Sequence, residues 1–272
     1  MEKNKLQKTV LITGASSGIG EAIAKLLSQK GYQVFGTSRN PNASNKLAWE
    51  MITLDLNQPD SITKAIEEVI RQAGKIDVLI NNAGLGITGP AEETPLKEVE
   101  NVFQANLFGT CQVINEVIPH MRKNKFGKII NITSIAGYMG LPYRGFYSAS
   151  KAALIQVSEA YRMEIEQFGI QVSCLAPGDI ATNIASRRFH SVAKEKSPYF
   201  KNYQASLNLM DNHVDEGMSA QKVALEIEKI IKSRKPKVHY LVGGFLEKFS
   251  IYLKRFLPQK TYESLLKKHY NL

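Results

Sequence analysis

Tyr147 and Lys151 stand four residues apart in the run Tyr147-Ser148-Ala149-Ser150-Lys151. On a helix this spacing places the phenol and the ammonium on one face, about one turn apart. A free phenol has a pKa of about 10, too high for efficient proton transfer near neutral pH, and a fixed cation beside it favours the phenolate. The pair therefore predicts a general acid and base, provided that a reacting group lies nearby. Of the eleven tyrosines, only Tyr147 has a lysine four residues later.

A glycine-rich turn near the N-terminus is the second feature that could do chemistry. The run Thr13-Gly14-Ala15-Ser16-Ser17-Gly18-Ile19-Gly20 joins an apolar segment to one with helical periodicity. Glycines let the backbone turn sharply and approach a pyrophosphate, and a helix N-terminus offers unpaired N–H groups and a positive dipole end. The turn therefore predicts a nucleotide-binding site, or else only a tight connection between a strand and a helix.

The end of the second expected strand indicates which nucleotide would bind. An acidic residue at this place would bind the ribose 2′-hydroxyl of NAD and repel a 2′-phosphate. Here the strand ends in Ser38 and Arg39, and a guanidinium is well shaped for a phosphate. We predict NADP(H) as the cofactor; the alternative is that Arg39 is only a solvated surface charge.

The strands and helices that would position these groups alternate along the chain. Apolar runs of strand length occupy residues 8–13, 32–37, 50–54, 76–80, 127–133, 170–176 and 237–242. Helical patterns lie at about 18–30, 60–73, 95–124, 145–168 and 219–233. Near-continuous apolar strands separated by helices are typical of a parallel sheet covered on both faces. We therefore expect an α/β fold, with one Rossmann-type, doubly wound catalytic domain over residues 1–242.

Two segments stand outside this alternation. Residues 183–218 show no strand pattern and form an insertion that we expect to serve as a lid or binding element. Residues 243–272 form a basic, amphipathic extension with a possible second helix around Leu265 and Leu266. Its apolar residues recur at three- and four-residue steps before Pro258 breaks the helix: Phe245, Leu246, Phe249, Tyr252, Leu253, Phe256 and Leu257. This stripe suits peripheral contact with a membrane through 245–272, or packing on the lid or on another subunit.

Composition narrows the class of protein. The 272 residues, 43% of them hydrophobic, can bury one sizeable core. The N-terminus lacks the apolar stretch of a secretory signal, and no run of about 18 apolar residues predicts a spanning helix. Cys111 and Cys174 are isolated and the five histidines have no ligand spacing, so we expect a cytoplasmic protein without a metal site. Of the net charge of +10, a balance of +8 lies from Lys232 onward, which argues against a nucleic-acid-binding surface spread over the fold.

Four further patterns fall at mutually consistent places. Asn81-Asn82-Ala83-Gly84 ends the fourth strand, and Asn106 lies within the long helix that follows. Ser134 closes the fifth strand thirteen residues before Tyr147, and Pro177-Gly178 follows the sixth strand, with Thr182 just beyond. Over roughly residues 7–242 the set resembles the short-chain dehydrogenase/reductase family, in particular members of the hydroxysteroid and retinol dehydrogenase type.

The resemblance implies roles for the matching residues. Tyr147 would exchange a proton with the substrate oxygen, and Ser134 would orient that oxygen. Lys151 would bind the nicotinamide ribose and lower the phenol pKa, and Asn106 would support a water chain that resupplies the proton. The implied cofactor contacts are Gly14, Ser16, Ser17, Gly18, Ile19, Gly20, Ser38, Arg39, Asp55, Leu56, Asn82, Ala83, Gly84, Tyr147, Lys151, Pro177, Gly178, Ile180 and Thr182. The resemblance also implies a homodimer or homotetramer, with the helices near 95–124 and 145–168 as contact surfaces.

The expected substrate site is apolar. Its residues would be Ser134, Ala136, Leu141, Tyr143 and Tyr147, with Ile135 and Met139 beside them. Such a lining favours a lipophilic ketone, aldehyde or secondary alcohol, such as a steroid, retinoid or fatty-chain compound, unless these side chains only pack the lid on the core. Two alternatives stay open: an enzyme acting on a polar sugar or an acyl-carrier substrate, and a non-catalytic NADP(H)-sensing or membrane-associated scaffold protein.

Overall fold

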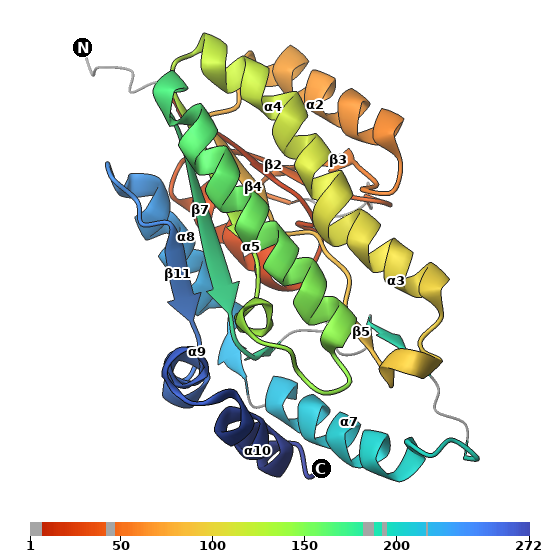
Figure 1. Cartoon of the computed structure of the whole chain (residues 1–272). Helices are drawn as coiled ribbons and strands as arrows, with labels where there is room; N and C mark the ends of the chain where they lie inside the picture. Colours follow the sequence, from red (N-terminus) through yellow and green to blue (C-terminus); the bar gives the residue numbers. More distant parts are fainter. Residues whose placement is uncertain (1–6, 42–46, 182–187, 192–194, 216) are drawn as a thin grey trace.

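The computed structural model describes residues 7–41, 47–181, 188–191, 195–215 and 217–272. Within them, seven parallel strands form one sheet with helices on both faces (Figure 1). In spatial order the strands are β11 (His239–Val242), β7 (Ile170–Pro177), β6 (Gly127–Ile132), β4 (Val78–Asn81), β1 (Thr9–Ile12), β2 (Gln33–Ser38) and β3 (Glu50–Thr53). The predicted doubly wound parallel sheet is confirmed, and each of these strands ends within two residues of its apolar run.

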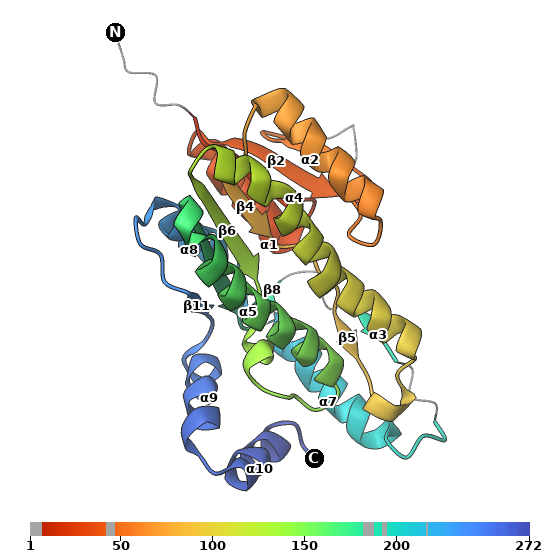
Figure 2. The ribbon, with the colours of Figure 1, turned by 45° about the horizontal axis from the view of Figure 1, so that its top comes forward.

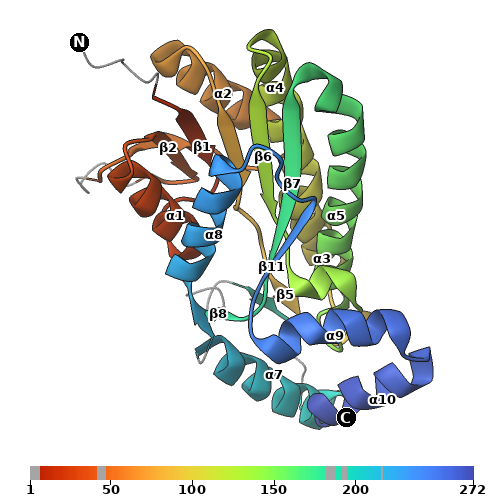
Figure 3. The same ribbon diagram turned by 90° about the vertical axis from the view of Figure 1, so that its left-hand side faces the viewer.

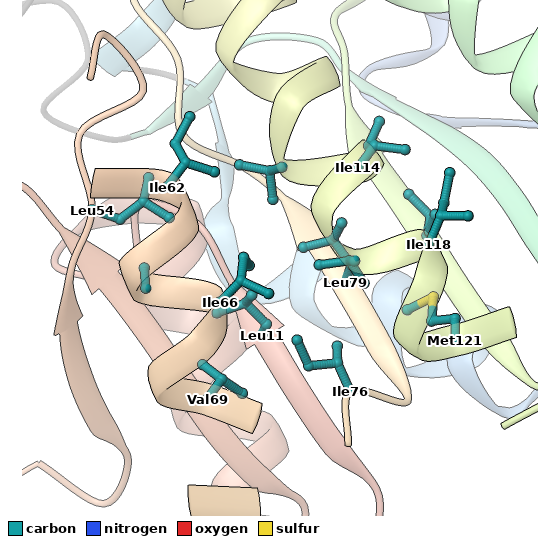
Figure 4. Close-up of a cluster of buried hydrophobic side chains, with 14 of the residues drawn as sticks. Leu11, Leu54, Ile62, Ile66, Val69, Ile76, Leu79, Ile114, Ile118 and Met121 are labelled. Atoms are coloured by element: carbon teal, nitrogen blue, oxygen red, sulfur yellow. The ribbon is translucent and has the colours of Figure 1, made fainter. Parts of the chain in front are cut away.

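Successive side chains of the strands point to opposite faces of the sheet and pack in two separate hydrophobic cores. Leu11 points to the face covered by α2 (Pro59–Ala73), α4 (Gly109–Lys123) and α5 (Gly145–Ile165). Val10 and Ile12 pack in the second core, on the other face. This face is covered by α1 (Gly18–Gln29) and α8 (Ala220–Lys232), which lie on one side of the sheet in Figure 3. Figure 4 shows the first core, in which Ile62, Ile66 and Val69 of α2 face Ile114, Ile118 and Met121 of α4 across Leu11 and Leu79. Each such side chain contributes about 1.5–3 kcal/mol by leaving water, so the sheet is held from both sides.

The long helix predicted over 95–124 is continuous but not uniform. It consists of α3 (Leu96–Phe103), a π-helical segment (Gln104–Phe108) and α4, which run as one rod in Figure 2. Short 3-10 turns occupy Ala91–Glu93, Ile135–Tyr138 and Glu166–Phe168. The second of these connects β6 to α5 and carries residues of the expected substrate site.

The expectation of an insertion without strands is wrong. Phe189–His190 forms β9, which pairs with β5 (Ile87–Thr88), and β10 (Met218–Ser219) pairs with β8 (Ile180–Ala181). Between them lies a long helix, α7 (Phe200–Asp215), which the sequence did not place. Two-residue strands carry no readable period, because their pairing is decided by the tertiary neighbours rather than by local propensity.

The C-terminal extension forms two helices, α9 (Phe245–Phe256) and α10 (Gln259–His269), and Pro258 separates them as predicted. With α7 they lie at the end of the molecule toward which β7 and β11 point (Figures 1 and 3). Leu253, Leu257 and Leu266 pack against a small core formed by Ile135, Met139, Ala176 and Tyr262. The predicted stripe is therefore divided: Phe245, Leu246, Phe249, Tyr252 and Phe256 stay exposed on the other side. None of the helices in the described ranges has the length and apolar character needed to cross a bilayer.

Candidate active site

Tyr147 and Lys151 lie in the first two turns of α5. The Lys151 ammonium is 5.9 Å from the centroid of the Tyr147 ring, on the face that the four-residue spacing predicts. Lys151 Nζ also donates to the carbonyl of Ile132, 3.1 Å away at the end of β6. Burial lowers the pKa of Lys151, and the charge that Tyr147 can carry opposes this effect. The cation is thus held between the sheet and the phenol.

Ser134 follows β6 and caps the 3-10 turn Ile135–Tyr138. Its Oγ accepts a hydrogen bond of 3.1 Å from Ala136 N, which leaves the hydroxyl hydrogen to donate elsewhere. The turn packs tightly on α5, since a Cβ at Gly137 would lie 3.1 Å from the Lys151 carbonyl carbon. Ser134 is therefore brought beside the part of α5 that carries Lys151, one helical turn from Tyr147.

Asn106 lies in the π-helical segment and is fully buried. Its Oδ1 accepts from Leu85 N at 2.7 Å, and its Nδ2 donates to Leu85 O and to Ser150 Oγ. Ser150 Oγ in turn donates to the Tyr147 carbonyl at 2.8 Å. Both amide hydrogens are thus occupied, and the side chain joins the loop after β4 to the first turn of α5. π-Bulges often mark functional sites, and Asn106 lies within this one.

A second cation flanks the phenol. The Arg144 guanidinium lies 5.3 Å from the Tyr147 ring centroid, within the range of cation–π attraction. Arg144 also lies near Tyr270. Burial raises the pKa of the Tyr270 phenol, and the charge of Arg144 opposes that rise. The sequence analysis did not identify Arg144, because nothing in its spacing distinguishes it from a solvated arginine.

The glycine-rich turn is shaped as a phosphate site requires. Gly14 and Gly18 adopt left-handed conformations with φ of +69° and +60°, which favour glycine. A side chain at Gly20 would overlap the carbonyl oxygen of Gly14 and the amide of Asn82. Asn82 Nδ2 donates to the carbonyls of Thr13 and Gly14, at 3.0 Å each. The turn ends at the N-terminus of α1, where Ser16 precedes the capping residue Ser17 and Ile19 lies between Gly18 and Gly20.

Thr13, which was not predicted as a site residue, organises the back of this turn. Its Oγ1 accepts from the backbone N–H groups of both Asn82 and Ala83, at 3.0 Å each. A Cβ at Gly14 would lie 3.0 Å from Ala83 Cα, so the loop after β4 closes directly on the turn. Gly84 packs against Asn106 and Lys151: a Cβ at this position would lie 2.8 Å from Asn106 Oδ1 and 3.4 Å from Lys151 Nζ.

The end of β2 carries the residues expected to select the cofactor. Arg39 is exposed, and in the described part of the chain Ser38 Oγ is buried without a hydrogen-bond partner. Across from them, Asp55 Oδ1 accepts from Asn57 N and forms a local turn after β3. Leu56 is buried beside it and lies against Gly109 of α4. Polar atoms left open at a strand end are consistent with a ligand there.

The loop after β7 contains Pro177, Gly178 and Ile180, while Thr182 lies outside the described residues. The structure adds Glu247 of α9 to this loop. Its Oε1 accepts from Asp179 N at 2.6 Å, its Oε2 accepts from Gly244 N, and the carboxylate occupies the space where a Gly178 side chain would be. Sequence reasoning missed Glu247, although a glutamate three residues after a helix-capping position is a recognisable capping signal.

Of the expected substrate residues, Ala136 lies in the 3-10 turn, and Leu141 and Tyr143 lie between this turn and α5. Tyr143 has φ of +57°, a strained conformation for an aromatic residue, and its ring lies 5.2 Å from that of Tyr203 in α7. Tyr262 of α10 donates to Met139 Sδ at 2.8 Å. A pocket of about 230 Å³ adjoins this region and is lined by Ile87, Thr88, Gly89, Ala91, Thr94, Leu141, Pro142, Tyr143, Gly145 and Phe146.

Comparison with known proteins places the chain among oxidoreductases. A sequence profile of the short chain dehydrogenase family matches residues 8–193. The chain is 37% identical to a 3-ketodihydrosphingosine reductase of Bacteroides thetaiotaomicron, over 96% of this chain and 97% of that protein. It is 32% identical to retinol dehydrogenase 8 of Bos taurus, over 84% of this chain and 79% of that protein. A short-chain dehydrogenase from Streptomyces avermitilis superposes with a TM-score of 0.80 at 29% identity, covering 96% of this chain and 99% of that one.

The region matched by the family profile contains the glycine-rich turn, the end of β6 and the tyrosine–lysine pair of α5, and the similarity to the relative from Bacteroides extends over 96% of the chain. Family, fold and site geometry agree. The chain belongs to the short-chain dehydrogenase/reductase family, whose oxidoreductases use a nicotinamide dinucleotide.

Proposed function

We propose that this protein reduces a long-chain ketone to a secondary alcohol with NADPH. The observation that carries the proposal is the phenol of Tyr147 with two cations beside its ring, Lys151 at 5.9 Å and Arg144 at 5.3 Å from the centroid. The loop before α5 adds an apolar wall, formed by Met139, Leu141 and Tyr143. The full-length similarity to a 3-ketodihydrosphingosine reductase supports a ketone joined to a long alkyl chain.

The residues present fit a dinucleotide. The turn at Gly14 and Gly20 leaves no room for side chains, so that backbone N–H groups of α1 can approach a pyrophosphate. The unpartnered Ser38 Oγ and the exposed Arg39 offer a hydroxyl and a guanidinium to a 2′-phosphate, and residues 36–41 contain no carboxylate to repel it. When bound, the nicotinamide supplies the hydride.

Tyr147 supplies the proton in this proposal. Hydride addition to a carbonyl builds negative charge on the oxygen, and donors already in place stabilise the transition state. Tyr147 gives its hydroxyl proton to that oxygen, while Ser134 donates its free hydroxyl hydrogen and orients it. The phenolate that remains is stabilised by the Lys151 and Arg144 charges. Alcohol oxidation would use the same residues in reverse.

Asn106 has a positioning role in this proposal. Both of its amide hydrogens bind protein acceptors, so it fixes Leu85 and the first turn of α5. Any water chain that returns protons to Lys151 would have to use the remaining lone pair of Oδ1 or the Asn106 backbone.

The apolar wall favours a lipophilic substrate over a sugar. Met139, Leu141 and Tyr143 come from the loop before α5, and α7 and α10 add Tyr203 and Tyr262. A retinoid is the second candidate, because the chain also resembles retinol dehydrogenase 8.

We also propose assembly as a dimer or tetramer through α4 and α5. Phe108, directly before α4, and Met163, on α5, are both exposed apolar side chains that such a contact would cover.

A chain-length series tests the substrate proposal. NADPH oxidation would be followed with ketones that share one polar head group and differ only in alkyl length, alongside retinal and a keto sugar. Each methylene that enters the site contributes about 0.8 kcal/mol, so kcat/KM should rise about fourfold per methylene until the pocket is filled. A flat dependence on length, or faster turnover of the sugar, would refute the lipophilic assignment. A parallel series with NADH checks the cofactor.

A further inference from the structure

We propose that the outer face of α9 binds the surface of an anionic lipid bilayer. Four aromatic side chains, Phe245, Phe249, Tyr252 and Phe256, follow one another at steps of four, three and four residues. This spacing keeps all four within one narrow stripe of the helix.

The stripe points away from the protein. Phe245 and Phe256 are 76% and 75% exposed, and Tyr252 is 56% exposed. Phe245 and Phe249 stack on each other with ring centroids 5.6 Å apart. Other sides of α9 already anchor the helix: Ile251, Leu253 and Leu257 pack in the small core, and the Glu247 carboxylate binds the loop after β7. The aromatic stripe is therefore surplus to the folding of this chain, and exposed apolar patches of this kind mark interaction sites.

The charges around the stripe favour lipid over a second copy of the chain. Residues 245–272 contain six Lys/Arg and two Glu. Arg255, Lys260, Lys267 and Lys268 are exposed, whereas Glu247 is turned inward onto Asp179. A symmetric contact between two copies would bring like charges together, which disfavours it. An aromatic face flanked by cations is the pattern of interfacial helices on anionic membranes.

The surface lies at the functional end of the molecule. α9 and α10 sit with α7 beyond the carboxyl ends of β7 and β11, and Tyr262 of α10 contacts the substrate wall at Met139 (Figure 3). Binding through this surface would hold the apolar wall close to the lipid. The binding itself does not depend on the substrate proposed above, so either proposal can fail alone.

Vesicle co-sedimentation of the full-length protein tests the proposal. Vesicles of phosphatidylcholine alone would be compared with vesicles that also contain phosphatidylglycerol. The protein should sediment with the anionic vesicles at least about tenfold more tightly than with the neutral ones, and salt should weaken this binding. The double variant Phe245→Ser/Phe256→Ser should lose at least about tenfold in affinity for anionic vesicles.

Leu225→Ser is the matched control, because this apolar side chain is 43% exposed on α8, away from α9 and from the helices of the proposed subunit contact. It should bind vesicles as the unaltered protein does. If Phe245→Ser/Phe256→Ser unfolds, Lys260→Gln/Lys267→Gln replaces it and should lose anionic binding while keeping its melting temperature. Equal sedimentation of the unaltered protein and Phe245→Ser/Phe256→Ser would overturn the proposal. So would a change from dimer to monomer in that variant without any vesicle binding by the unaltered protein, because the face would then join two copies.

Discussion

The glycine-rich turn after β1 and the C-terminal helices border the same site but are held in different ways. The turn is closed by short hydrogen bonds from Asn82 to Thr13 and Gly14 and by backbone contacts that leave no space. α9 contains no buried residue and depends on a few contacts, chiefly those of Glu247 and Leu253. The end expected to bind the cofactor is thus built into the core, whereas the C-terminal helices at the proposed substrate end are held to the core by few contacts.

The largest expected effect comes from the phenol between these two regions. Tyr147→Phe keeps the ring beside Lys151 and Arg144 but removes the proton, so kcat should fall by about 10²–10⁴-fold. Binding of NADPH, followed by fluorescence titration, should stay nearly unchanged. Tyr161→Phe makes the same change farther along α5, where the hydroxyl donates to Asn115. Activity in Tyr147→Phe equal to that of Tyr161→Phe would exclude the proton-donor role.

Arg39→Asp tests whether the strand end beside the glycine-rich turn selects NADPH over NADH. Replacing the guanidinium by a carboxylate removes charge-assisted bonds to a 2′-phosphate and adds repulsion, so the ratio of kcat/KM for NADPH over NADH should fall about a hundredfold. Lys123→Asp gives the same change in net charge at the exposed end of α4. An unaltered ratio in Arg39→Asp would mean that Arg39 is a surface charge.

Gly20→Ala tests whether the turn is as closed as its contacts indicate. The added methyl overlaps Gly14 O and Asn82 Nδ2, so the free energy of unfolding should fall by about 1–3 kcal/mol and NADPH should bind roughly tenfold more weakly. At Gly140 a Cβ meets nothing within 4 Å, and Gly140→Ala should leave both quantities unchanged. Denaturant melts and titration of NADPH measure them. Similar results for the two alanines would contradict a rigid turn.

Glu247→Ala should have the smallest effect, because it acts at the end that few contacts hold to the core. It leaves Asp179 N and Gly244 N without their carboxylate acceptor, so the KM for NADPH should rise roughly fivefold while kcat changes little. Glu263 is the other tail glutamate, and its carboxylate accepts from Gln259 Nε2. Glu263→Ala should change neither constant. A loss of kcat alone in Glu247→Ala would show that the carboxylate does not act through the cofactor loop.

The same difference explains what could be predicted from the sequence. Gly14 and Gly18 are readable because a left-handed backbone demands glycine, and Tyr147 with Lys151 because four residues make one helical turn. Glu247 is not readable as a site residue, since it meets Asp179 across 68 positions of the chain.

In the C-terminal helices, too, the sequence pattern alone does not show which apolar residues pack on the core. A period of three and four residues places Leu253 and Phe256 on apolar stripes, but only the docked helix shows that Leu253 packs inward while Phe256 faces outward. Likewise α7 has a mixed pattern without a clear apolar stripe, so its position depends on contacts such as that of Tyr203 with Thr88.

The π-helical segment around Asn106 makes the number of residues in the continuous helix from α3 to α4 important for the site. A π turn contains one residue more than an α turn, so deleting one residue from Gln104–Phe108 would restore a regular helix. Because the wide π turn had absorbed the extra residue, the two halves of the rod would keep nearly the same rotation about its axis. α4 would keep its apolar side chains on the sheet, but the wide turn that places Asn106 against Leu85 and Ser150 would be lost. A one-residue deletion here would therefore displace Asn106 even if every side chain that contacts it were kept.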